Sequence, residues 1–217
     1  HWDHIQGLPF FQPAYHPAFK LHIHGSPKHD IRLESVLHGQ MDSIYFPVPM
    51  TAFGSEIEVS EIDCKTLKYS KCEITFLELD HPGGSLSFKI KANDRTIVYA
   101  TDHELNNHFD DNTELIDNSA LGKAYLDFIS DADLLIADGQ YTDEEYKTKA
   151  GWGHSTISLL LKVAHKAKVK QVAVYHHDPT HTDKFLDELS TNYLHKYQDS
   201  DPLMDVFWAR EGLSLAL

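Results

Sequence analysis

Histidine and aspartate residues come together at four places along this chain of 217 residues. The chain opens on His1, Asp3 and His4, a tight cluster of imidazole and carboxylate groups. Three further clusters each follow a segment with the pattern of a β-strand: Asp80-His81, Asp102-His103 and His176-His177-Asp178. Carboxylates and imidazoles are the side chains that bind adjacent divalent ions such as zinc. The residue types therefore point to metal-ion chemistry.

One such cluster alone is weak evidence for a metal site, because a short His/Asp turn is more often simply solvated. Clusters that follow three separate strands are stronger evidence, since strand ends at one edge of a sheet can converge on a single site. Unrelated surface histidines have no reason to occupy strand ends. Although 16 histidines are dispersed along the chain, the pattern favours one shared metal site over isolated histidines.

The elements that must position these clusters follow from the periodicity of the apolar residues. Strands are predicted at Phe19 to Gly25, Thr66 to Asp80, Ser85 to Lys91, Thr96 to Ala100, Leu134 to Ala137, Val172 to Tyr175 and Asp205 to Ala209. Helices are predicted at Ile31 to Met41, Ala120 to Ile129, Ser155 to Lys168 and Asp183 to Lys196, and Tyr45 to Ser60 reads as a loop with edge-strand character. The pattern indicates an antiparallel meander, followed by sheet covered with helices.

The composition is that of one globular domain, with 41% hydrophobic residues and no interdomain linker. No apolar run is long enough to cross a bilayer and no segment resembles a signal peptide, so no membrane partner is expected. The formal net charge of −14 repels polyanions and argues against broad nucleic-acid binding. With only Cys64 and Cys72 present, neither a disulfide framework nor a thiolate zinc site is expected, which favours the cytoplasm.

The opening His1-Trp2-Asp3-His4-Ile5-Gln6-Gly7 resembles the end of the His-x-His-x-Asp-His signature of the metallo-β-lactamase superfamily. Within that superfamily, the segments Ala137 to Tyr141, Gly153 to Thr156, and Val169-Lys170 before a strand and a histidine are most similar to ribonuclease Z and the related cyclic-phosphate phosphodiesterases. The resemblance covers the whole chain. It implies an α+β fold, the four-layer αββα sandwich, whose opening strands and first metal-binding histidine would precede His1.

The resemblance also implies a set of metal ligands. His1 and His81 would bind one divalent ion together with the upstream histidine, and Asp3, His4 and His176 would bind a second. Asp102 would bridge the two ions. Zinc is the expected metal, with manganese or iron as alternatives. Asp3 would also orient the attacking water.

The position of the last ligand has two alternatives. Without gaps, the distance from His154 matches the ribonuclease Z pattern at His176, so His176 is favoured over His177. The resemblance implies that His154 faces the scissile phosphate as a proton donor or oxyanion stabiliser, and that Asp138 supports it. The simpler alternative for His154 is a solvated residue at a helix start. Ala137 departs from the family pattern, because the family has a histidine there.

The resemblance favours a phosphodiesterase that acts on a small or cyclic phosphodiester. Hydrolysis of a lactone, ester or thioester is the enzymatic alternative, and a non-catalytic metal-containing sensor or binding protein is the other. Precursor tRNA is not the expected substrate, because Glu104 to Asp133 is short of basic residues where ribonuclease Z carries a basic arm. The oligomeric state stays open, with a homodimer as one option.

Overall fold

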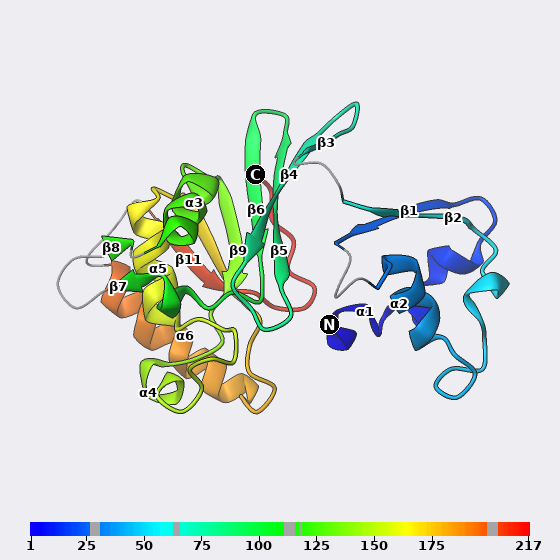
Figure 1. Ribbon diagram of the computed structural model, residues 1–217. Helices are drawn as coiled ribbons and strands as arrows, with labels where there is room; N and C mark the ends of the chain where they lie inside the picture. The colour runs from blue at the N-terminus through cyan, green and yellow to red at the C-terminus, as the bar shows by residue number, and fades with distance from the viewer. Residues whose placement is uncertain (27–30, 63–65, 111–115, 118, 199–203) are drawn as a thin grey trace. The chain divides into compact units, whose positions relative to one another are not determined.

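The computed structural model describes residues 1–26, 31–62, 66–110, 116–117, 119–198 and 204–217. Its Cα packing divides the chain into two compact units, His1–Cys64 and Lys65–Leu217. Each unit has its own cluster of buried apolar side chains. Figure 1 colours the first unit from blue to cyan and the second from cyan to red. That the two units form a single domain stays a prediction, and Cys64 falls outside the described residues.

The first unit consists of short helices and one pair of strands. Its elements are α1 (Trp2–Ile5), the 3-10 helices η1 (Leu8–Phe10) and η2 (Gln12–Tyr15), β1 (Lys20–Gly25), α2 (Leu33–Gln40), the 3-10 helix η3 (Met50–Ala52) and β2 (Glu56–Glu61). Strands β1 and β2 pair in parallel, from Lys20 opposite Glu56 to Gly25 opposite Glu61. The core of this unit is made by Ala14, Leu37, Met41, Met50 and Phe53.

Two of the three predictions for this unit are confirmed, since β1 and α2 lie within two residues of the expected bounds. The loop with edge-strand character predicted at Tyr45 to Ser60 has that character only in its last part, where the regular strand β2 begins at Glu56 and pairs with β1. Ile57 and Val59 alternate along β2 and pack on the core. This alternation is short, and the preceding proline-rich residues obscured it.

The second unit is built on a mixed sheet of seven strands, in the order β11-β10-β9-β6-β5-β4-β3. The strands are β3 (Thr66–Lys68), β4 (Glu73–Leu79), β5 (Ser85–Ala92), β6 (Arg95–Ala100), β9 (Leu134–Asp138), β10 (Gln171–Tyr175) and β11 (Asp205–Trp208). Strands β3 to β6 are antiparallel neighbours. Strands β6, β9, β10 and β11 run in parallel. The predicted meander and the three later strands are therefore confirmed.

The single strand predicted at Thr66 to Asp80 is wrong, because the chain reverses within it. Strands β3 and β4 form a hairpin, and the backbone N–H of Tyr69 donates to the carbonyl of Cys72 across the turn, 2.8 Å away. The residues from Tyr69 to Cys72 include no glycine or proline, so the turn left no sequence signal. Cys72 accordingly lies just before β4 and not inside a strand.

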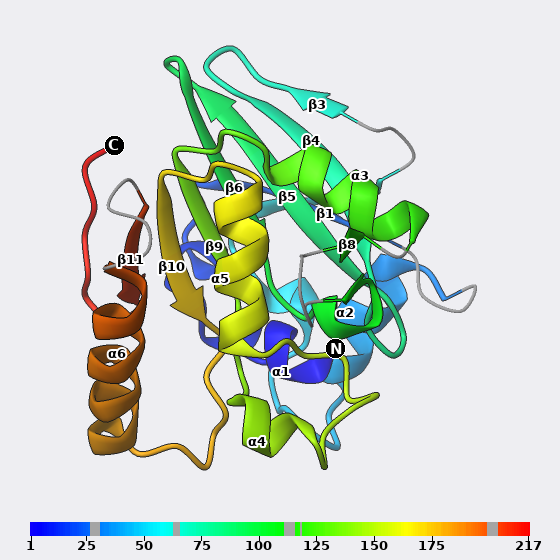
Figure 2. The ribbon, with the colours of Figure 1, turned by 90° about the vertical axis from the view of Figure 1, so that its left-hand side faces the viewer.

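Three helices lie along one face of this sheet, as Figures 1 and 2 show: α3 (Ala120–Ile129), α5 (Ile157–Lys166) and α6 (Asp183–Gln198). The connections contain α4 (Asp143–Tyr146), the 3-10 helix η4 (Leu105–Asn107) and a short pair of strands, β7 (Phe109–Asp110) and β8 (Ile116–Asp117). Thr156 caps α5, because its side chain accepts a hydrogen bond from the N–H of Leu159. Within the described ranges, no helix combines the length and the apolar character needed to span a bilayer.

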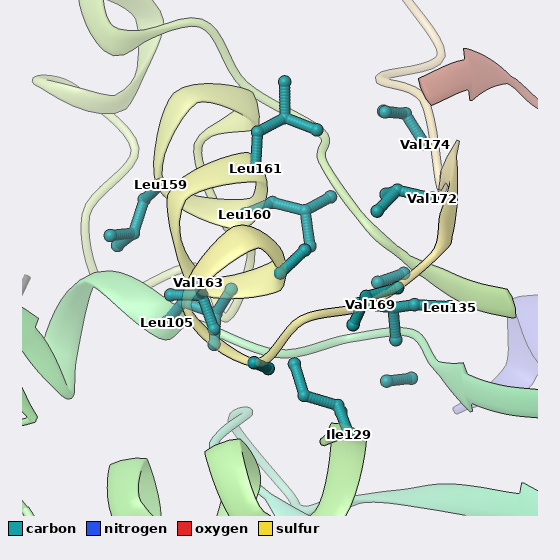
Figure 3. Close-up of a cluster of buried hydrophobic side chains, with 14 of the residues drawn as sticks. Leu105, Ile129, Leu135, Leu159, Leu160, Leu161, Val163, Val169, Val172 and Val174 are labelled. Carbon is teal, nitrogen blue, oxygen red and sulfur yellow. The ribbon is translucent and has the colours of Figure 1, made fainter. Parts of the chain in front are cut away.

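Helix α5 is the centre of the core of the second unit. Leu160 and Leu161 are fully buried, as are the sheet residues Leu135 and Val172. Figure 3 shows Leu160 pointing from α5 toward Val172 on the neighbouring strand. Burial of these apolar side chains anchors α5 on the sheet, and α5 in turn holds the loop that precedes it.

We expect Leu160→Ala to destabilise the protein by about 2–5 kcal/mol, because it opens a cavity between α5 and the sheet. Leu213→Ala is the matched control, since this leucine is 50% exposed, and we expect it to cost about 0.5 kcal/mol or less. Urea unfolding of the two variants measures the difference. Equal losses would contradict the central place of α5 in the core.

Candidate active site

The candidate site lies where three parallel strands of the second unit end. Strands β6, β9 and β10 are neighbours in register, with Ala100 opposite Ala137 and Tyr175 opposite Asp138. Asp102 follows β6, Asp138 ends β9 and His176 follows β10. Because parallel strands end at the same edge of a sheet, the three side chains meet there. The convergence predicted for Asp102 and His176 is therefore present, and Asp138 lies between them on the middle strand.

Asp102 lies between two of the predicted ligands. Its Oδ1 is 2.9 Å from Nε2 of His176, and its Oδ2 is 3.9 Å from Nε2 of His81. Asp102 is only 6% exposed. Burial lowers the pKa of His81 below the ordinary value for histidine, so the neutral ring with a free lone pair, the form that binds metal, is favoured. Both Asp102 and His176 have a positive φ, at 55° and 59°.

Asp138 and His154 form a close pair beside Asp102. Oδ2 of Asp138 is 2.6 Å from Nδ1 of His154. Asp138 is 1% exposed and also accepts hydrogen bonds from the N–H groups of Gln140 and Ser155. The ring of His154 stacks on the ring of His176 at 4.9 Å. A carboxylate in this position fixes the orientation of the imidazole.

Four side chains each place one nitrogen or oxygen atom within 4.8 Å of the others: Asp102, Asp138, His154 and His176. Two carboxylates and two imidazoles at this spacing are donors that suit a divalent ion. Asp138 is already engaged by several hydrogen-bond donors. Its geometry therefore suits the support of His154 better than the direct binding of a metal.

A second buried carboxylate, Glu104, holds the loop that carries His154. Glu104 is 2% exposed. It accepts hydrogen bonds from the N–H groups of Gly151 and Gly153, at 2.6 and 2.7 Å, and from the hydroxyl of Tyr146 at 2.7 Å. Glu104 was not among the residues predicted from the sequence. Its only sequence signal is its place directly after Asp102-His103.

His154 is therefore a loop residue, and the expectation that it sits at a helix start is wrong. Helix α5 begins at Ile157, after its cap Thr156, and His154 lies before both. The side chain is 13% exposed and faces Asp138 and His176, which also excludes a purely solvated residue. The physical reason is that Glu104 and Asp138 bind the backbone around His154 and keep it outside the helix.

The neighbouring histidines have other contacts. Nε2 of His177 lies 3.2 Å from the carbonyl of Ala209, so the geometry favours His176 over His177 as the residue that faces Asp102. His103 is 1% exposed, and burial lowers its pKa to about 3. Nδ1 of His103 accepts a hydrogen bond from the N–H of Asp80, which fits a structural role. His181 pairs with Glu145 at 2.7 Å.

The remaining predicted ligands, His1, Asp3 and His4, belong to the first unit. Asp3 and His4 lie on α1, and His1 directly precedes that helix. Nε2 of His4 is 3.5 Å from Oδ2 of Asp3, and both side chains are accessible. Their participation in one site with His81, Asp102 and His176 stays a prediction.

Residues 1–177 match the family model described as the β-lactamase superfamily domain. A search of curated proteins finds no match. Among solved structures, the chain is similar to the metallo-β-lactamase fold protein YhfI from Bacillus subtilis, with 17% identity, a TM-score of 0.60, and coverage of 98% of this chain and 73% of that chain. It is also similar to the short form of human tRNase Z, with 16% identity, a TM-score of 0.62, and coverage of 100% and 75%. It is similar to unliganded yeast PDE1 as well, with 15% identity, a TM-score of 0.65, and coverage of 98% of this chain and 65% of that chain. These likenesses confirm the predicted fold.

Gly153 permits the close approach of His81 to the loop of His154. Its φ is +91°, and a Cβ at this position would lie 2.2 Å from Cδ2 of His81. Gly151 also has a positive φ, of +85°, but a Cβ there would meet nothing within 4 Å. A substitution at Gly151 therefore tests backbone strain alone, whereas the same substitution at Gly153 adds a collision with His81.

We expect Gly151→Ala and Gly153→Ala to share a strain of about 1–2 kcal/mol, because both need a left-handed backbone. Only Gly153→Ala should also displace His81, and displacement by about 1 Å can lower turnover on the order of a hundredfold. Thermal unfolding and hydrolysis of bis(p-nitrophenyl) phosphate measure the two effects. Equal activity of the two variants would contradict the contact between the loop and His81.

Proposed function

This chain belongs to the metallo-β-lactamase superfamily, and on that premise we propose that it is a metal-dependent phosphodiesterase acting on a small or cyclic phosphodiester. The observation that carries the proposal is the pair formed by His154 and the buried Asp138, next to Asp102 and His176. This pair adds an imidazole of fixed orientation to the predicted ligands. Hydrolysis of a lactone, ester or thioester, and a sensor without catalysis, are the alternatives that the experiments below separate.

We propose that two divalent ions, zinc in the first instance, bind at this site. The buried carboxylate of Asp102 lies between two imidazoles, which suits a bridging ligand. His81 with His1 would hold one ion, and His176 with Asp3 and His4 the other. Bound ions of this kind supply Lewis acidity, which makes water a nucleophile at neutral pH and offsets the charge of a phosphodiester.

His154 would act on the substrate without holding a metal. With Nδ1 directed at Asp138, its Nε2 is the atom that can give a proton to a departing alkoxide or a hydrogen bond to a phosphoryl oxygen. Asp138 would keep this ring in one orientation. Asp3 would orient the attacking water. A phosphodiester needs such a hydrogen-bond donor more than a neutral carbonyl substrate does, because its phosphoryl oxygens already carry a negative charge.

The charge of the chain supports a small-molecule substrate over precursor tRNA. Segment 104–133 holds few basic residues, and the net charge of −14 would repel a long polyanion. We further propose the cytoplasm as the location, on the scarcity of cysteine alone.

We expect Asp102→Asn to lose bound metal and activity, because the amide keeps the shape and tolerates the positive φ but removes the charge between the two imidazoles. Removal of a group that only hydrogen-bonds to a metal ligand lowers metal affinity roughly 10- to 100-fold. The loss in Asp102→Asn should be larger, because we expect Asp102 to bind the metal directly. Metal analysis after dialysis measures it, with the exposed Glu78→Gln as control. Two tightly held ions in Asp102→Asn would rule out the bridging assignment.

We expect His154→Ala to lower turnover by about 10²- to 10⁴-fold for alkyl phosphodiesters, because an alkoxide needs a proton to leave. The loss should be smaller for bis(p-nitrophenyl) phosphate, whose leaving group needs no proton. Metal content should stay unchanged. The exposed His165→Ala is the control. Near-normal activity of His154→Ala on both substrates would contradict the proton-donor role of His154 and remove the observation that carries the proposal.

A further inference from the structure

The first unit contains a pocket of about 650 Å³ that the ligand assignments leave unused. This volume is in the range of sites for small molecules. Its walls come from α1, η1, the end of α2 and the segment after α2. Figure 1 shows α1 and α2 close together within this unit.

The walls of the pocket are largely aromatic. Trp2 is 67% exposed, Phe10 69% and Tyr45 77%. Phe10 packs edge-on against Phe46, with 5.5 Å between the ring centres, so one wall is a fixed pair of rings. Three large exposed aromatic side chains around one concave site are typical of a binding site, where a bound ligand covers them. A flat apolar or aromatic group fits such walls best.

One half-buried polar side chain of the pocket, Gln40, has an amide group whose two polar atoms are buried and unsatisfied. Gln40 ends α2 and lines the pocket. Both its amide oxygen and its amide nitrogen are buried, and neither has a hydrogen-bond partner among the described residues. A buried polar group without a partner is destabilising, because it has lost its hydrogen bonds to water and gained none in return. A ligand that carries a donor and an acceptor side by side would satisfy both atoms of this amide.

The pocket and the predicted metal ligands share α1. Trp2 and Gln6 both line the pocket and are four residues apart, so they lie on one face of the helical turn. Asp3 and His4 lie between them in sequence. A group held against Trp2 is therefore bound by the same short helix that carries Asp3, whose carboxylate we expect to bind metal.

We propose that this pocket binds a flat heteroaromatic group attached to the phosphodiester, with its ring against Trp2 and Tyr45 and its edge paired with the amide of Gln40. The inference rests on the proposed function, because it names a substituent of the same substrate. Nucleobases have the required chemistry. They stack on aromatic side chains, and adenine offers adjacent donor and acceptor atoms that a glutamine amide pairs with.

The test measures the binding of adenosine and of purine riboside, which lacks the amino group of adenosine, to the intact protein by calorimetry. Neither nucleoside contains a phosphodiester, so binding is measured apart from hydrolysis. We expect adenosine to bind about tenfold more tightly or better, because only adenosine can pair with both atoms of the Gln40 amide. In Gln40→Met this preference should vanish, and Gln12→Met, an exposed glutamine outside the pocket, should keep it. Tyr45→Ala should weaken both nucleosides, whereas Phe19→Ala should weaken neither.

Equal binding of the two nucleosides to the unchanged protein, or a preference that survives Gln40→Met, would overturn the inference. Hydrolysis of bis(p-nitrophenyl) phosphate separates this outcome from failure of the proposed function. Hydrolysis without selective binding of adenosine would refute the pocket and leave the phosphodiesterase. Selective binding without hydrolysis of any phosphodiester would support the pocket and refute the phosphodiesterase.

Discussion

The buried carboxylate of Asp138 is the group on which the arrangement of the site depends. An ionised carboxylate away from water is costly unless donors surround it. Here the donors come from His103, Gln140 and the His154–Ser155 segment, so one side chain ties together three loops that are distant in sequence. The strand register brings Asp138 beside Tyr175, and His176 follows at once. The contacts that hold this edge of the sheet together are therefore also the contacts that position the side chains of the candidate site.

Glu104 is a second buried carboxylate that hydrogen-bond donors surround, and it lies in the loop after Asp102. Its carboxylate accepts hydrogen bonds from two backbone N–H groups of the loop before His154 and from Tyr146. Ser155, which is fully buried, links the loop to the backbone after Asp102 by donating to the carbonyl of His103 and accepting from the N–H of Leu105. Two buried acids thus hold the His154 loop from opposite ends, and α5 anchors it to the core.

Much of the fold could be predicted from the sequence, because period-two and helical patterns mark most strands and helices of the second unit. The gathering of Asp102 and His176 followed from their places after strands. The turn at Tyr69 to Cys72 could not be predicted, since ordinary residues form it. The structural role of Glu104 could not be predicted either, because its hydrogen-bond donors come from residues more than 40 positions away in the chain. The place of His154 outside α5 depends on those same distant donors.

The left-handed backbone at Asp102 has a consequence for the comparison of homologous sequences. At a φ of 55°, glycine, asparagine and aspartate are tolerated, whereas β-branched residues are strongly disfavoured. A descendant that had lost catalysis would still be under pressure to retain a residue of this small group. An aspartate retained at this position in a homologue is therefore weak evidence of activity. A retained His81 or His154 is more informative, since no positive φ restricts the residue type at either position.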